Sequence, residues 1–180
     1  MATTMRSPAT EEDLLSAPED GYKRELVDGE IQVSPAGARH GHVCIELSTR
    51  LASFVKGRRL GFVFDSSTGF RLPGGNVRLP DVAFVASGRF EGDEPTIGFS
   101  PVPPDLAVEV LSPSDRPRQV LDRIGEYLGA GVRLVWVIDP EGRKATVYRS
   151  LTDVKTVDEA GALDGGDVVP GFACQLAAIL

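Results

Sequence analysis

Two short segments constrain the fold of this chain most: LPDVAFV at residues 79–85 and DLAVEVLS at residues 105–112. Successive side chains of an extended strand point to opposite faces, and both faces of these segments are almost entirely apolar. Such a pattern is typical of a central strand that is covered on both sides. Each segment nevertheless places one carboxylate on an apolar face, Asp81 in the first and Glu109 in the second.

The patterns elsewhere in the chain predict what covers these strands. Apolar residues recur at three- and four-residue steps over residues 41–58 and 117–131, which predicts two amphipathic helices. An Asp-Gly pair between two alternating segments predicts a tight hairpin over residues 24–34. Residues 77–86 predict one continuous strand. The order of strands and helices predicts an α/β or mixed α+β fold, with a central mixed β-sheet flanked by helices.

Length and composition bound the class of protein. The 180 residues predict one domain over residues 1–180, with a flexible segment at residues 1–10. Cys44 and Cys174 lie far apart, and no apolar run approaches the ~20 residues of a membrane span. We therefore expect a cytoplasmic protein with reduced thiols and no membrane contact. The net charge of −7 argues against a protein that coats nucleic acid, but it leaves room for an enzyme with a local basic patch.

The two strand acids point to a cation. An ionised carboxylate inside a sheet is costly unless a basic side chain or a bound cation pairs with it, or unless it stays protonated. Consecutive strands of one small sheet are usually neighbours, so we expect Asp81 and Glu109 to lie close together. Two such carboxylates repel each other, and a divalent cation such as Mg²⁺ takes oxygen ligands of this kind. The alternative is a structural salt bridge between a strand acid and an arginine.

Several segments carry a resemblance to a known family. Pro80-Asp81, followed by Glu109-Val-Leu-Ser112, resembles the PD-(D/E)XK nuclease signature. Over roughly residues 12–180 the chain is similar to the Uma-two family of restriction-endonuclease-like proteins. The segments that carry this similarity are GYKRELVDGEIQVSP, His40, LPDVAFV, PDLAVEVLSPSD, EYLGAGVRLVWVIDP and GDVVPGFACQLAAIL.

The resemblance implies a restriction-endonuclease-like fold and a metal-dependent endonuclease that hydrolyses DNA. Asp81 and Glu109 would be the metal ligands, and the carbonyl of Val110 would add a further oxygen. Glu25 would be an accessory acid. The implied cofactor is Mg²⁺ or Mn²⁺, and a homodimer would let two sites cut two strands.

One position departs from the signature. The signature has a lysine two residues after the glutamate, where this chain has Leu111. In the family the basic residue comes from the following helix, four residues before its tyrosine, and Arg123 stands there before Tyr127. Arginine stays protonated, so it cannot act as a general base, but it can stabilise charge that builds on a phosphate.

Three further residues are expected at the mouth of the site: His40, as the resemblance implies, Ser112 and Tyr127. For His40 the alternative is an ordinary residue at the end of a helix. His40 and His42 do not face one another on a helix, so a zinc site between them is not expected. For Ser112 the alternative is turn chemistry before the next helix, with Asp115 as the N-cap.

Glu25 also has an alternative interpretation. On the predicted hairpin it would be an exposed residue that pairs with Lys23 or Arg24. The site role and the surface role are equally compatible with the sequence.

A second function competes with the nuclease. Loss of lysine at position 111 favours a catalytically inactive protein that keeps the fold and binds nucleic acid or another protein. In that case Asp81 and Arg123 would form a buried structural pair under the loop near residues 91–104. Retention of both strand acids favours catalysis.

Overall fold

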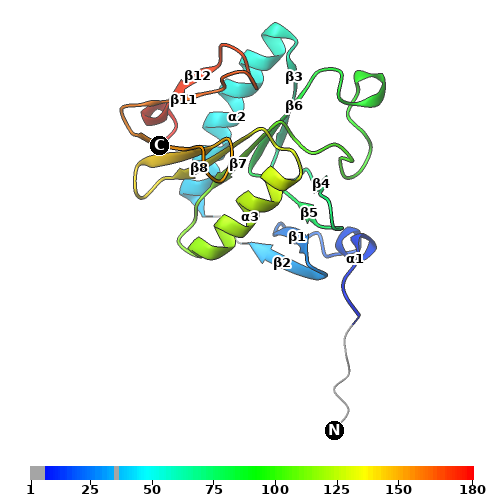
Figure 1. The fold of residues 1–180 in the computed structure, drawn as a ribbon. Helices are drawn as coiled ribbons and strands as arrows, with labels where there is room; N and C mark the ends of the chain where they lie inside the picture. The colour runs from blue at the N-terminus through cyan, green and yellow to red at the C-terminus, as the bar shows by residue number, and fades with distance from the viewer. Residues whose placement is uncertain (1–6, 35–36) are drawn as a thin grey trace.

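The computed structural model describes residues 7–34 and 37–180 (Figure 1). The flexible segment expected at residues 1–10 falls largely on residues 1–6, which lie outside the described residues. Within the described part, the amide of Ala9 donates to the carbonyl of Gly29 at 2.7 Å.

The main element is a six-stranded mixed sheet. Its strands, in spatial order, are β10 (Val154–Asp158), β9 (Lys144–Tyr148), β8 (Leu134–Asp139), β7 (Leu106–Val110), β6 (Val82–Ala86) and β3 (Gly61–Asp65). The pairing of β7 with β8 is parallel, and the other pairings are antiparallel. The prediction of a central mixed sheet is confirmed, and β6 and β7 are neighbours as expected.

Two helices cover the opposite faces of this sheet (Figure 1). Helix α2 (Ala38–Arg58) buries Val43, Leu47, Leu51 and Val55 against the face that carries Val108 and its alternate neighbours. Helix α3 (Pro117–Gly129) buries Val120, Ile124 and Tyr127 against the other face. Both helices were predicted from their apolar stripes, and they explain why β6 and β7 are apolar on both faces.

A smaller four-stranded sheet packs beside the first. Its strand order is β2 (Glu30–Ser34), β1 (Lys23–Val27), β5 (Val77–Arg78) and β4 (Phe70–Arg71). Strands β1 and β2 form the predicted hairpin, and the turn residues Asp28 and Gly29 both have positive φ, at 49° and 76°. Helix α1 (Glu11–Leu15) contributes Leu14 to the core of this sheet.

The continuous strand predicted for residues 77–86 is wrong. The segment divides between the two sheets, as β5 in the smaller one and β6 in the larger one. Pro80 lies at the break, where its missing N–H removes a donor for a strand ladder. Asp81 therefore lies at the bend just before β6, although its amide still donates to the carbonyl of Val108 at 2.9 Å.

The C-terminal part covers the same sheet face as α2. It comprises β11 (Ala162–Asp164), β12 (Ala173–Gln175) and the 3₁₀ turn η2 (Leu176–Ala178), and another 3₁₀ turn, η1 (Glu91–Asp93), lies in the loop after β6. Both cysteines have free thiols in the described part of the chain. Among residues 7–34 and 37–180, no helix has both the length and the apolar character needed to cross a membrane.

Candidate active site

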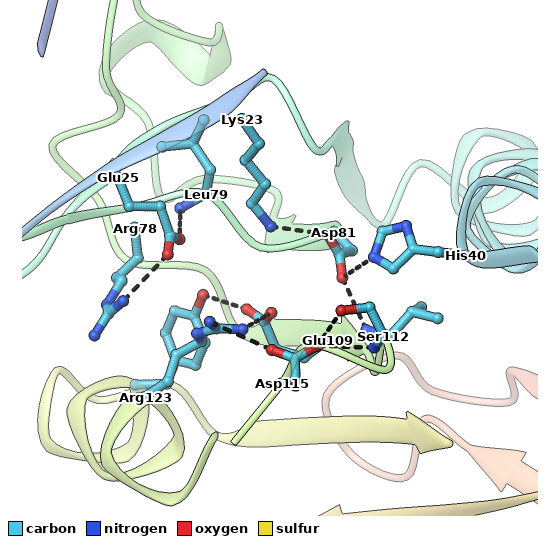
Figure 2. Close-up of polar contacts among 12 residues, drawn as sticks. Lys23, Glu25, His40, Arg78, Leu79, Asp81, Glu109, Ser112, Asp115 and Arg123 are labelled. Carbon is cyan, nitrogen blue, oxygen red and sulfur yellow. Dashed lines mark hydrogen bonds and ion pairs between the residues drawn. The ribbon is translucent and has the colours of Figure 1, made fainter. Parts of the chain in front are cut away.

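The antiparallel pairing of β6 with β7 brings the two strand acids together. Val82 lies opposite Val108, and the amide of Val110 donates to Asp81 Oδ2 at 2.8 Å. Asp81 and Glu109 are only 3% and 2% exposed. Figure 2 shows both carboxylates directed into the same space.

That space is a cleft of about 680 Å³. The β1–β2 hairpin and α3 supply opposite walls, and His40 at the start of α2 lies at one end (Figure 2). The lining residues are Lys23, Val27, Asp28, Gln32, Val33, Ser34, His40, Arg78, Asp81, Glu109, Val110, Ser112, Ser114, Asp115, Gln119, Asp122, Arg123 and Glu126.

One half of the cleft centres on Asp81, and we call Asp81, Lys23 and His40 the Asp81 half. Lys23 Nζ lies 2.8 Å from Asp81 Oδ1, and His40 Nε2 lies 3.0 Å from Oδ2. Burial would raise the pKa of Asp81, but the hydrogen bond with His40 and the charge of Lys23 hold that pKa well below its ordinary value. The same hydrogen bond raises the pKa of His40 to about 10. At neutral pH the carboxylate is therefore ionised and faces two cations.

The other half centres on Glu109, and we call Glu109, Arg123 and Tyr127 the Glu109 half. Arg123 Nη1 donates to Glu109 Oε2 at 2.6 Å, and the Tyr127 hydroxyl donates to Oε1 at 2.6 Å. Burial raises the pKa of Glu109 above its ordinary value, against the opposing charge of Arg123. Burial also raises the pKa of Tyr127, so the phenol remains a neutral donor. Tyr127 is fully buried beneath Glu109 and does not lie at the mouth of the site, because it belongs to the apolar stripe of α3.

Glu25 is buried, so the exposed surface role considered from the sequence is wrong. Its carboxylate accepts from Arg78 Nη1 at 3.1 Å and from the amide of Leu79 at 2.7 Å. Arg78 also donates to Glu126 on α3. Glu25 therefore ties β1 to the connection that leads into Asp81, and through Arg78 to the opposite wall.

Ser112 lies beyond the end of β7 and lines the cleft. Its amide and hydroxyl donate to Asp115 Oδ2 at 2.7 and 2.8 Å. The expectation that Asp115 is the N-cap of α3 is wrong, because Arg116 occupies that position and the Asp115 carboxylate is engaged by Ser112.

The chain matches a known family over most of its length. The family described as "Putative restriction endonuclease" (Uma2) matches residues 11–177. The chain belongs to this family. A solved structure described as a "putative nuclease belonging to DUF820", from Anabaena variabilis ATCC 29413, has a TM-score of 0.82 and 23% identity, and the match covers 96% of this chain and 97% of that one. No curated protein matches the chain.

Lys23 lines the cleft of this Uma2 chain, although the sequence did not predict it as a site residue. It was considered only as a surface partner for Glu25. The signal was present, because residues two apart on a strand share a face and Lys23 is two residues before Glu25. Its contact with Asp81 spans 58 residues of sequence, and only the packing of the two sheets creates it.

Leu111, the residue at the usual lysine position, is not among the residues that line the cleft. It lines a separate groove of about 370 Å³ beside α3, with Pro117, Val120 and Leu121. A side chain at position 111 is thus directed toward the packing of α3 rather than toward the two acids.

His40, Cys44 and Asp81 form a cluster in which one potential ligand atom of each lies within 4.8 Å of the others. Cys44 Sγ lies 3.6 Å from His40 Nδ1, whereas Asp81 lies against His40 Nε2. The thiol and the carboxylate therefore contact different nitrogens of one imidazole. This arrangement does not favour a single ion shared by the three residues.

The oxygen donors fit a hard divalent cation better. Six carboxylates line the cleft, against three permanent cations, Lys23, Arg78 and Arg123. Mg²⁺ and Mn²⁺ take carboxylate oxygens, which Asp81 and Glu109 direct into this space. A cation on Asp81 would take the place now held by Lys23 or His40.

Proposed function

We propose that this Uma2 protein is an endonuclease that hydrolyses phosphodiester bonds of DNA with Mg²⁺ or Mn²⁺. The observation that carries the proposal is the convergence of Glu109, on β7, and Asp81, at the bend before the neighbouring strand β6, on a cleft that Lys23 and Arg123 also line. Membership of a family described as restriction endonucleases supports the same reaction class.

Asp81 and Glu109 would hold the cation, with the carbonyl of Val110 as a further oxygen ligand. When bound there, a divalent cation polarises a phosphate oxygen and lowers the pKa of a bound water. Arg123 lies against Glu109 and offsets negative charge that develops on the phosphate. Glu25 acts as a positioning residue, because it holds Arg78 and the amide of Leu79 just ahead of Asp81.

The remaining residues shape the entrance. His40 and Ser112 lie at the rim and offer donors to a phosphate, while Tyr127 fixes the Glu109 carboxylate from below. Because the net charge of the chain is −7, DNA would be held by the local cations of the cleft and by the bound metal. A homodimer would let two sites cut the two strands of a duplex.

The test is calorimetry with Mn²⁺ followed by a DNA-cleavage assay. We expect the wild type to bind Mn²⁺ and to cut DNA, and Asp81→Ala to lose both properties, because one of two carboxylate ligands is removed. Asp153→Ala, at an exposed position after β9, is the matched control and should behave as the wild type. A wild type that neither binds Mn²⁺ nor cuts DNA would refute the proposal.

One observation favours the second candidate, an inactive protein that binds nucleic acid or another protein. Each carboxylate oxygen of Asp81 and Glu109 already has a protein donor. The specific pair expected in that case is wrong, because Arg123 contacts Glu109 and not Asp81, and residues 91–104 do not line the cleft. DNA binding without Mn²⁺ binding would select this candidate.

A further inference from the structure

Lys23 is the only lysine among the described residues that line the cleft. It extends from β1, in the smaller sheet, to the acids of the larger sheet (Figure 2). Its Nζ lies 2.8 Å from Asp81 Oδ1, and Figure 2 shows the ammonium between the carboxylates of Glu25, Asp81 and Glu109.

Positions 111 and 123, which were expected to supply the basic group, are less suitable than Lys23 for direct contact with a phosphate. Leu111 is apolar and lines the groove beside α3. Arg123 is already engaged, with one nitrogen on Glu109 and another 4.0 Å from Asp115, and its side chain is 13% exposed. The buried Nε of Arg123 has no hydrogen-bond partner in the described structure, and Arg123 belongs to α3.

Arg123 offsets charge from its place on Glu109, and a lysine can add the direct contact with the phosphate. The lysine ammonium is a compact charge with three donors on a flexible stem, so it can turn from a carboxylate to a phosphate without loss of its charge. In the present structure Lys23 Nζ has Asp81 Oδ1 as its hydrogen-bonded partner, and the Lys23 side chain is 17% exposed and lines the cleft.

We infer that Lys23 is the catalytic lysine of this site, and that it contacts the scissile phosphate from β1 in place of a lysine at position 111. The inference rests on the proposed function. In the hydrolysis a water oxygen bonds to phosphorus and the bond to one ester oxygen breaks. The water gives a proton to solvent, and the leaving oxygen takes one from solvent. Lys23 keeps its own proton and stabilises the extra negative charge on the phosphate.

If Lys23 has this role, removal of its charge should affect Mn²⁺ binding and the rate of DNA cleavage in different ways. Without substrate, the ammonium balances Asp81 and occupies space near the metal ligands. Removal of that charge should leave Mn²⁺ binding as tight as in the wild type or tighter, because a competing cation is gone. The same removal should slow cleavage, because the phosphate loses its charged donor.

The experiment measures Mn²⁺ binding by calorimetry and single-turnover DNA cleavage at saturating Mn²⁺. The variants are Lys23→Met, Lys23→Arg and the control Lys155→Met, an exposed lysine on β10. We expect Lys23→Met to cut about 100-fold more slowly while binding Mn²⁺ at least as tightly, as is typical when one transition-state donor is removed. Lys23→Arg should recover part of the rate, and Lys155→Met should match the wild type.

Each other outcome has a defined meaning. Cleavage by Lys23→Met at the wild-type rate would overturn the assignment of Lys23 and leave the proposed function standing. Loss of Mn²⁺ binding together with cleavage would overturn it as well, because Lys23 would then be structural. A wild type that neither binds Mn²⁺ nor cuts DNA would refute both proposals. Lys23→Gln, which keeps a donor for Asp81 without the charge, repeats the test if Lys23→Met does not fold.

Discussion

The Asp81 half and the Glu109 half of the cleft each stabilise a buried carboxylate, but they do so with different partners. Each holds one acid that is almost fully buried, Glu109 on β7 and Asp81 at the bend just before β6. Asp81 receives its cations from β1 and α2, elements that are far from it in sequence. Glu109 receives both of its donors from α3, 14 and 18 residues further along the chain.

The difference indicates which half can exchange its cation. Lys23 and His40 come from two separate elements, β1 and α2, so one contact can be lost without the other, and Asp81 then keeps the backbone amide of Val110. Arg123 and Tyr127 are held on one helix that packs against the sheet, so their contacts with Glu109 move only if the helix moves. We therefore expect the Asp81 half to admit a divalent cation and the Glu109 half to act as its rigid support.

The largest effect on stability should come from breaking the Glu109 half. Arg123→Met leaves Glu109 buried without its cation, and removal of one partner of a buried ion pair typically costs about 3–5 kcal/mol. We expect a loss in the free energy of unfolding near the lower end of that range, because Arg123 retains some exposure. Urea unfolding of the wild type and the variant at neutral pH measures it.

The matched comparisons are Arg118→Met and Lys23→Met. Arg118 is on the same helix with a side chain that is 95% exposed, so its replacement should leave stability nearly unchanged. Lys23→Met should cost less than Arg123→Met, because Asp81 keeps His40 and the amide of Val110. Equal losses for Lys23→Met and Arg123→Met would contradict the contrast between the halves.

The parts of this site that follow from local pattern were predictable. Apolar residues on both faces identify β6 and β7 as central strands, and consecutive central strands of a small sheet are usually neighbours. That reasoning placed Asp81 beside Glu109, and the structure confirms the pairing of the strands. The stripe of α3 likewise placed Arg123 at the edge of the buried face, from which it reaches the sheet.

The parts that depend on packing between sheets were not predictable. Pro80 is a local signal of a break within residues 77–86, but the alternation continues on both sides of it, and nothing local shows that the two parts belong to different sheets. Lys23 looks like a surface residue until the smaller sheet packs beside the larger one. The alternative of an inactive protein paired Arg123 with Asp81, whereas Arg123 contacts Glu109, because periodicity gives the face of a residue but not its contact across a cleft.

A smaller effect should come from the neutral donor of the Glu109 half. Tyr127→Phe removes the hydroxyl that donates to Glu109 Oε1 at 2.6 Å, and it leaves the ring in place. A buried acceptor that loses one donor costs about 1–3 kcal/mol, and Arg123 still satisfies the other oxygen. Thermal or urea unfolding checks the value, with Tyr148→Phe on β9 as the control for loss of a tyrosine hydroxyl. A Tyr127→Phe variant as stable as the wild type would show that the hydroxyl does not stabilise Glu109.

The smallest effect belongs to His40 in the Asp81 half, and it should depend on pH. Contact with Asp81 raises the pKa of His40 from 6.5 to about 10, so the folded protein binds this proton more tightly than the unfolded chain. Its stabilising contribution is therefore complete below pH 6.5 and is lost as the pH rises toward 10. His40→Gln should cost at most about 1 kcal/mol below this window, as is typical of a partly exposed ion pair, and the difference from the wild type should shrink as the pH rises through it. Urea unfolding across that pH range measures the difference, with His42→Gln on the same helix as the control. A difference that grows with pH would mean that His40 does not share its proton with Asp81, and the two halves would then not differ as proposed.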